Sequence, residues 1–309
     1  MSRRVPVPSM IGVYDRSCPV SRRRILDLFR AMSEYDRRVS WMPADALRPT
    51  GLWGYSFAVV SATAIERFRS VASQRLTVIV DANDDVGDDA MYVVAPDHRR
   101  SKGLRSVLLP TLTPASDIVL ADATGRPTVA WLDPSPCSRI PAVVERSRSI
   151  LTALRKLRPD VCILADRRLY PDTDVHIDGR MSDIDRMRAF AMADIALFVG
   201  ASCAHDDLGV CETLSVGKAL PVCVGMSIDA LSRYAVCLDA DAGECARSID
   251  RLLTLLARPD GLSYRRRIMS GWAYVQRERS LTPMRVYSAW LSLIEFYHDI
   301  TKVRYVPVA

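Results

Sequence analysis

Several nucleotide-binding and catalytic signatures are missing from this sequence. The first apolar strand pattern of each half is not followed by G-x-G-x-x-G, and the sequence has no Walker A loop. Neither Ser202 nor Ser215 lies in a G-x-S-x-G setting, and His176 and His298 fall in or beside apolar segments. These absences count against a nicotinamide-dependent oxidoreductase, a P-loop enzyme and a nucleophilic hydrolase.

Long apolar runs and paired cysteines are also missing. No stretch approaches the roughly 18 apolar residues of a membrane span, and residues 1–10 have no apolar signal region. We therefore expect a cytoplasmic protein that is neither secreted nor membrane-spanning. None of the eight cysteines belongs to a C-x-x-C pair, which predicts reduced and mostly buried thiols. They are Cys18, Cys137, Cys162, Cys203, Cys211, Cys223, Cys237 and Cys245.

No metal site is indicated by the remaining ligand-type residues. Cys203, His205 and Cys211 lie close together in the sequence, but their spacing matches no standard zinc pattern. His98 stands in a basic turn, where it could face an anionic acceptor or simply be exposed to solvent.

Arginine supplies most of the net positive charge. The chain of 309 residues carries a formal charge of +6, with basic clusters at residues 22–24, 99–102 and 265–267. An anionic partner, including nucleic acid, is one interpretation. The alternative is that these arginines lie on solvated helix faces, and charge alone does not decide between the two.

Short apolar, β-branched runs alternate with amphipathic helical patterns along the whole chain. This pattern predicts an α/β fold with two Rossmann-like, doubly wound domains. In the first half, strands are predicted at residues 11–14, 39–42, 57–61, 76–80, 91–94 and 118–121. Ser21 is a candidate N-cap for a helix whose buried face carries Ile25, Leu28, Phe29 and Met32.

A second cycle of strands and helices opens after Pro127. Strands are predicted at residues 128–132, 161–164, 175–177, 195–199 and 221–224. We therefore place an N-terminal domain at residues 1–126 and a C-terminal domain at residues 127–309. The aromatic-rich tail, with Trp272, Tyr287 and Trp290, is predicted to form helices that cross back to the first domain.

Two helices of the second half have recognisable ends. Ser182 and Asp185 have the spacing of a capping box, followed by Ile184, Met187 and Ala191 on one expected face. Gly217 suits the C-terminal end of a helix over residues 210–216.

The segment Gly200 to Glu212 is the natural place for a ligand, because ligands of open α/β sheets lie beyond the carboxyl ends of the strands. Backbone N–H groups at the following helix start would hold a diphosphate, and Gly209 would allow close approach. Glu212 could accept hydrogen bonds from ribose hydroxyls, and Asp206 and Asp207 from a sugar. Equally, Glu212 could only complement its helix dipole while the aspartates act as caps or solvated loop residues.

Four segments resemble a motif of the retaining, family-4-type GT-B glycosyltransferases. They are Ala193-Asp194-Ile195, Asp207-Leu208-Gly209, Glu212-Thr213-Leu214-Ser215-Val216-Gly217 and Pro221-Val222. The family pattern reads roughly A-D-x-x-x-x-P-S, then E-x-F-G, then E-A-M-A-x-G-x-P-V. The resemblance covers about residues 127–290 and implies a GT-B glycosyltransferase, with a phage-type, DNA-modifying member as one form.

By this resemblance, Glu212 would hold the donor ribose, and Asp206 or Asp207 would contact the transferred sugar. The other implied donor-binding residues are Gly179, Arg180, Leu208, Gly209, Val210 and Lys218. The first two of these would flank the base, and residues 208–210 would meet the phosphates. The family usually has an arginine and a lysine that neutralise the diphosphate; here only Arg139 stands in that segment, with Lys218 as a substitute.

The resemblance implies sugar transfer from a nucleotide-diphosphate-sugar, with a UDP-sugar favoured, to an acceptor hydroxyl. The configuration would be retained, and neither a metal nor a cofactor would be strictly required. Asp81, Asp84 and His98 are the acceptor-side candidates, although the family's glycine-rich loop after the first strand is absent. The spacing of Asp207 and Glu212 is also shorter than that of the family's two glutamates. The alternative is a GT-B-like subunit with a decayed site that binds nucleotide-sugar or nucleic acid.

Overall fold

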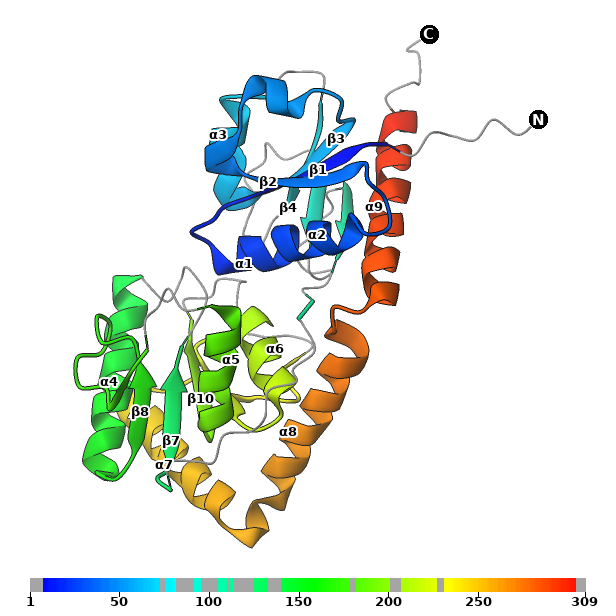
Figure 1. The fold of residues 1–309 in the computed structure, drawn as a ribbon. Coiled ribbons are helices and arrows are strands. Elements are labelled where there is room, and N and C mark those ends of the chain that lie inside the picture. The colour runs from blue at the N-terminus through cyan, green and yellow to red at the C-terminus, as the bar shows by residue number, and fades with distance from the viewer. Residues whose placement is uncertain are drawn as a thin grey trace. The chain divides into compact units, whose positions relative to one another are not determined.

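The computed structural model describes residues 8–72, 76–81, 92–95, 105–109, 112–113, 125–132, 140–177, 182–200, 207–226 and 231–303. The chain packs into two compact units (Figure 1). Unit 1 comprises Met1–Leu112 with Leu281–Ala309, and unit 2 comprises Thr113–Ser280. Each unit is built on its own parallel sheet, which confirms the α/β prediction.

The sheet of unit 1 has the strand order β2-β1-β3-β4-β5-β6. Its strands are β1 (Met10–Tyr14), β2 (Val39–Pro43), β3 (Phe57–Ser61), β4 (Thr77–Asp81), β5 (Tyr92–Ala95) and β6 (Arg105–Leu108). All pairings between them are parallel. The order reverses between β1 and β3, as in flavodoxin-like doubly wound sheets. The strand predicted at residues 118–121 lies outside the described residues.

Helices cover both faces of this sheet. They are α1 (Pro19–Ser21), the π-helical turn η1 (Arg22–Asp27), α2 (Leu28–Met32), α3 (Ile65–Arg69) and α9 (Pro283–Val303), with short 3-10 turns at Ala44–Ala46, Pro49–Leu52 and Ala62–Ala64. The predicted buried face of Ile25, Leu28, Phe29 and Met32 is confirmed, and the apolar side of α9 joins the same core cluster.

The N-cap prediction for Ser21 is wrong. Ser21 has helical backbone angles, and its hydroxyl accepts a hydrogen bond from the Asp15 N–H at 2.9 Å. The helix begins earlier, at Pro19, whose fixed φ suits a first helical position.

The sheet of unit 2 has the strand order β12-β11-β10-β7-β8-β9. Its strands are β7 (Thr128–Trp131), β8 (Cys162–Ala165), β9 (Val175–His176), β10 (Ile195–Val199), β11 (Leu220–Val224) and β12 (Val236–Leu238). Read from β9, this is the Rossmann order, in which the first strand of the unit is central and the order reverses beside it. The reversal lies between β7 and β10.

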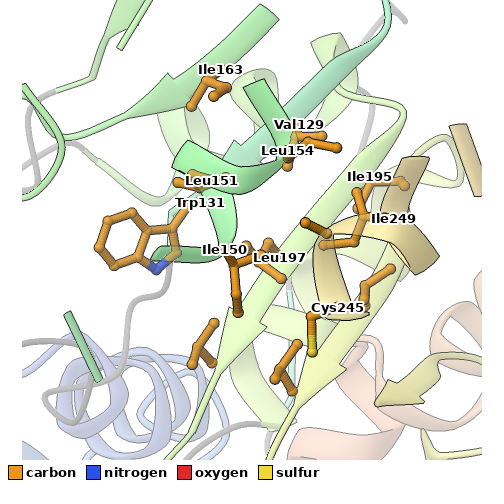
Figure 2. Packing of buried hydrophobic residues seen from close by; sticks show 14 of the residues in the cluster. Val129, Trp131, Ile150, Leu151, Leu154, Ile163, Ile195, Leu197, Cys245 and Ile249 are labelled. Carbon is orange, nitrogen blue, oxygen red and sulfur yellow. The ribbon is translucent and has the colours of Figure 1, made fainter. Parts of the chain in front are cut away.

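Two helical layers bury the two faces of this sheet. The helices are α4 (Pro141–Leu157), α5 (Asp183–Met192), α6 (Asp207–Val216), α7 (Ala242–Ala257) and α8 (Leu262–Tyr274), with the turns η8 (Pro259–Gly261) and η9 (Val275–Arg279). Alternate strand residues such as Val129 and Leu197 pack against α4 and α7, as Figure 2 shows. Their neighbours, such as Ala130 and Phe198, pack against α5 and α6. This period-two alternation on buried strands explains the continuous apolar runs in the sequence.

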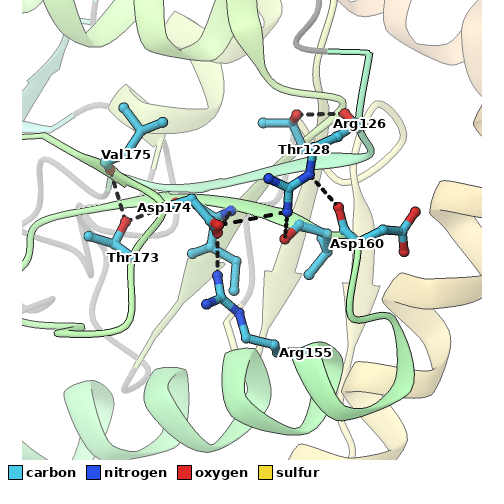
Figure 3. A network of polar contacts seen from close by, with 9 residues as sticks. Arg126, Thr128, Arg155, Asp160, Thr173, Asp174 and Val175 are labelled. Atoms are coloured by element: carbon cyan, nitrogen blue, oxygen red, sulfur yellow. Dashed lines mark hydrogen bonds and ion pairs between the residues drawn. The ribbon is translucent and has the colours of Figure 1, made fainter.

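The amino ends of β7 and β8 are fixed by a polar network (Figure 3). Arg126 donates from Nε to the Asp160 carbonyl at 2.8 Å and lies 3.7 Å from the Asp174 carboxylate. Arg155, near the end of α4, also pairs with Asp174. The Thr173 hydroxyl donates to the Val175 carbonyl at 2.9 Å. These contacts lie at the amino ends of the strands, opposite to the carboxyl ends at which ligands of doubly wound sheets bind.

The two units differ from the predicted domains at their borders. Leu112 is buried in the core of unit 1, whereas the Thr113 N–H donates to the Arg279 carbonyl of unit 2 at 2.8 Å. The chain therefore passes between units after Leu112, not near residue 126. The last helix, α9, belongs to unit 1 because its apolar side chains complete that core.

Candidate functional site

The carboxyl ends of β7 and β10 mark the candidate site of unit 2. In doubly wound sheets, ligands bind where the strand order reverses, and here β7 and β10 are neighbours with connections on opposite sides. The connection after β10 leads directly into α6, which begins at Asp207. Several predicted site residues lie outside the described residues: Asp84, His98, Arg139, Gly179, Arg180 and Asp206.

Residues 208–210, in the first turn of α6, offer backbone groups rather than side chains. Leu208 is 1% exposed and Val210 is fully buried, and both side chains pack in the interior of unit 2. Gly209 is buried between them. The first N–H groups of a helix have no partner within the helix, and the dipole favours an anion beside them. These three residues can therefore contact a phosphate only through the backbone.

Glu212 lies in the second turn of α6 and forms a buried ion pair. The Arg186 guanidinium donates from Nε to one carboxylate oxygen at 2.6 Å and from Nη2 to the other at 2.7 Å. The Glu212 side chain is fully buried and that of Arg186 is 6% exposed. A bidentate pair between two buried side chains is strongly oriented. It joins α5 to α6 directly under the candidate site.

The local sequence of α5 explains how Arg186 reaches Glu212. Ser182 caps the helix by accepting the Asp185 N–H at 3.2 Å, which confirms the predicted cap. A hydrogen bond from the Ser182 hydroxyl, and then the nearby Arg188, lower the pKa of Asp185. The buried face begins at Arg186 and Met187; Ile184, predicted on that face, is 56% exposed.

Sequence reasoning did not single out Arg186, although a signal was present. A charged residue stands on a helix face that is otherwise made of Met187, Ala189 and Phe190. Charged side chains are rarely buried without a partner, so such a position indicates a buried acid elsewhere in the fold. The partner is Glu212, the residue predicted to hold ribose.

This pairing changes what Glu212 can do. Both oxygens already accept a hydrogen bond from Arg186, and none of the side chain is open to solvent. A carboxylate has about four acceptor positions, so a ribose hydroxyl could add a further bond only after the surface above Glu212 opens. The ribose role of Glu212 stays a prediction.

Lys218 lies far from the start of α6, where a phosphate would bind. Helix α6 runs from the carboxyl end of β10 to the amino end of β11, and Lys218 follows the helix, just before β11 begins at Leu220. With a rise of about 1.5 Å per residue, the helix separates the two ends by roughly 15 Å. Lys218 therefore lies at the edge of the sheet opposite the candidate site and does not serve as the substitute cation.

Arg146 of α4 is a cation that the sequence analysis did not select. Its Nη2 donates to the Ala240 carbonyl at 3.0 Å, just after β12. A Cβ atom on Gly225, which follows β11 with a φ of 66°, would come within 2.4 Å of the Arg146 Nη1. Gly225 thus leaves room for a guanidinium beside the carboxyl ends of β11 and β12.

In unit 1, Asp81 ends β4 at the carboxyl edge of the sheet, as predicted. Its carboxylate is 2% exposed, and Arg24 of η1 donates to it from Nε at 3.0 Å and from Nη2 at 2.6 Å. Arg24 also donates to the Leu109 carbonyl. Asp81 therefore ties η1 to the sheet, and its role toward an acceptor stays a prediction.

In the part of the chain that the structure describes, no helix combines the length and the apolar character needed to cross a bilayer.

No family model matches the sequence, and no curated protein matches it. Solved structures do match by shape. HepE from Anabaena, in complex with UDP and glucose, aligns over 93% of this chain and 99% of its own, at 10% identity and a TM-score of 0.64. A glycosyltransferase from Rickettsia africae aligns over 93% and 98%, at 11% identity and a TM-score of 0.62.

Two further matches show how far the likeness reaches. TarM from S. aureus has a TM-score of 0.53 at 9% identity, and this chain spans about half of it, 55% of its length. The N-terminal domain of a Candida albicans trehalose-6-phosphate phosphatase aligns over 95% of this chain and 98% of its own, with a TM-score of 0.59 at 8% identity. Identities this low establish the fold and not the activity. With two Rossmann-like units and these neighbours, the chain has the GT-B fold.

Proposed function

We propose that this protein transfers a sugar from a nucleotide-diphosphate-sugar to an acceptor hydroxyl. One observation carries the proposal: α6 is the helix that follows β10, and β10 lies beside the reversal of strand order in a Rossmann sheet. That position directs the backbone N–H groups of residues 207–210 at a ligand beyond the strand ends.

The structural neighbours support this reading by analogy. The matched structure of HepE contains UDP and glucose. That of the rhamnosyltransferase SpnG contains thymidine diphosphate. The shared fold covers more than nine-tenths of this chain in both cases. A nucleoside diphosphate sugar is therefore the donor class to test first, with UDP-sugars at the head of the list.

The proposed chemistry is attack of an acceptor oxygen on the anomeric carbon as the nucleoside diphosphate departs. The helix dipole of α6 and Arg139 would stabilise the charge that develops on the leaving phosphate. The leaving phosphate would help to deprotonate the acceptor, so the step needs no metal and retains the configuration. Asp206 and Asp207 would orient the sugar hydroxyls.

For the acceptor, we propose modified nucleic acid as the class to test first. The net charge of +6 is compatible with an anionic acceptor, although solvated arginines would give the same charge. Binding through phosphates should weaken steeply as salt is raised. Binding that does not change between low and high salt would remove nucleic acid from consideration.

A second candidate is a binding subunit that holds a nucleotide-sugar without transferring it. The buried pair of Arg186 and Glu212 favours this alternative, because it occupies the carboxylate that would otherwise meet the ribose. The match to a phosphatase N-terminal domain shows that the fold also occurs in proteins named for another activity.

Sugar release from UDP-sugars, with and without acceptor, separates the two. We expect hydrolysis or transfer by the native chain and a loss of about a hundredfold in Arg139→Ala, the magnitude typical for one stabilising donor. Arg188→Ala, an exposed arginine on α5, is the matched control and should retain activity. Binding without turnover would favour the binding subunit. If the chain shows no binding and no turnover with any UDP-sugar, the donor site is refuted.

A further inference from the structure

Two cysteines face each other on neighbouring strands at the edge of the sheet of unit 2. Cys223 of β11 and Cys237 of β12 are register partners in a parallel pair. Side chains of aligned residues on adjacent strands lie on the same face of the sheet. The pairing of β11 with β12 therefore places the two thiols next to each other, and no loop conformation is needed to bring them together.

The two thiols differ in their access to solvent. Cys223 is fully buried in the core against α5 and α6, whereas Cys237 is exposed on the last strand of the sheet. Both are in the reduced form. A reagent in solution therefore reaches Cys237 first. Cys223 is its register partner on the neighbouring strand and is buried.

The environment of Cys237 also favours its thiolate. A hydrogen bond from the Cys223 thiol and the positive charge of Arg267 lower the pKa of Cys237 to about 7 from the ordinary 9.0. Arg267 is held in place, because its Nη1 donates to the Ala235 carbonyl at 3.0 Å. Burial raises the pKa of Cys18, Cys162 and Cys245 instead. Among the described cysteines, Cys237 is the one prepared to react.

We propose that Cys223 and Cys237 form a modification site at which a hydroperoxide oxidises the pair to a disulfide. In the first step the Cys237 thiolate attacks the peroxide O–O bond; a sulfenic acid forms and hydroxide or alkoxide leaves. In the second step the Cys223 thiol attacks the sulfenic sulfur; the S–S bond forms, the S–O bond breaks and water leaves. The two sulfurs lose two electrons in total, and the peroxide gains them.

The spacing of the strands permits this bond. Neighbouring strands lie about 4.8 Å apart, which is within the Cα separation of roughly 4.4–6.8 Å that disulfides require. The strand that must adjust is β12, which ends the sheet and is paired on one side only, to β11. The disulfide would join β12 covalently to β11 and would be reversed by a dithiol reductant.

Peptide mapping of the full chain tests the proposal. The protein is treated with hydrogen peroxide, blocked with iodoacetamide and digested with trypsin. Cleavage after Lys218, Arg233 and Arg247 puts Cys223 and Cys237 on adjacent peptides. A disulfide joins them as a pair that dithiothreitol separates, whereas a missed cleavage at Arg233 gives one peptide that it does not separate. Because Cys245 shares a peptide with Cys237, Cys245→Ser is the matched control.

We expect joined peptides in the native chain and in Cys245→Ser, and none in Cys237→Ser. In Cys223→Ser, Cys237 should instead accumulate a sulfenic acid that dimedone traps. Joined peptides that persist in Cys237→Ser, or that vanish in Cys245→Ser, would overturn the proposal. So would a native chain in which Cys237 is oxidised without joining Cys223. Thermal unfolding of each variant confirms that it is folded before treatment.

Discussion

Replacing Arg186 by methionine should strongly destabilise unit 2. The change removes a guanidinium that makes two short hydrogen bonds, at 2.6 Å and 2.7 Å, to the fully buried carboxylate of Glu212. Methionine fills similar space without charge, so the dominant effect is an uncompensated buried carboxylate. Breaking a buried pair by removing one partner costs about 3–5 kcal/mol of unfolding free energy.

The control is an arginine two positions away on the same helix. Arg188 pairs with Asp185 at 3.2 Å, but the two side chains are 67% and 50% exposed. Ion pairs between exposed side chains contribute little to stability, because water and salt screen them. Arg188→Met should therefore lower the stability far less than Arg186→Met.

A double variant separates the pair energy from packing. Glu212→Leu alone leaves a buried cation, whereas Arg186→Met with Glu212→Leu replaces both charges by apolar groups. Buried pairs replaced in this way often lose little stability, so we expect the double variant to be more stable than either single one. The assay is urea unfolding followed by tryptophan fluorescence, for which Trp131, 3% exposed in the core of unit 2, is a reporter.

If the stability of Arg186→Met lies within about 1 kcal/mol of the native chain, the range of exposed pairs, the buried pair does not hold α5 to α6 as described. Strictly additive single effects in the double variant would lead to the same conclusion, because contacting charges must couple.

Three smaller predictions follow from other parts of the structure. Asp81→Asn should lower the stability of unit 1 by about 3 kcal/mol in urea unfolding, because it breaks the buried pair with Arg24. Gly217→Ala should cost about 1–2 kcal/mol in the same assay, since Gly217 has a φ of 72° and a Cβ would lie 3.0 Å from Trp272; an unchanged midpoint would show that the turn has shifted. Iodoacetamide labelling of Cys237 should rise with a midpoint near pH 7, because its lowered pKa, about 7, exposes the thiolate from that pH upward; a midpoint near 9 would contradict this.

The sequence predicted the sheets well because their strands are buried on both faces. Residues 57–61 and 195–199 were predicted as strands and match β3 and β10 at both ends. Such strands read as unbroken apolar runs between turn residues. Helix ends with a local chemical cause were also predictable, as at Ser182 and Gly217.

Short and partly exposed elements were missed for the opposite reason. Strands β6 and β12 were not predicted, and β12 has only half-buried and exposed residues. Its position depends on pairing with β11, which is a property of the sheet rather than of residues 236–238. The predicted N-cap at Ser21 failed because the Asp15 N–H uses that hydroxyl.

The role of the candidate site stays a prediction, but the helix that carries Glu212 was predicted over residues 210–216 and is observed as Asp207–Val216, because Gly217 marks its end. The sequence did not reveal that Arg186 engages Glu212 or that Arg24 engages Asp81, since both pairs join residues far apart in the chain. Lys218 was proposed as a substitute cation from its residue type, although it follows the predicted C-terminal end of the helix and so lies away from the start of α6.

Thermal unfolding of the native chain tests whether unit 2 binds a nucleoside diphosphate at the start of α6. UDP, GDP, ADP, thymidine diphosphate and their sugars would each be added in increasing concentration. A ligand that binds only the folded state should raise stability by about 2.7 kcal/mol at a hundred times its Kd. We expect such a rise for one of these bases and a loss of the rise in Arg139→Ala. If none of these ligands raises the stability, unit 2 does not bind a nucleoside diphosphate.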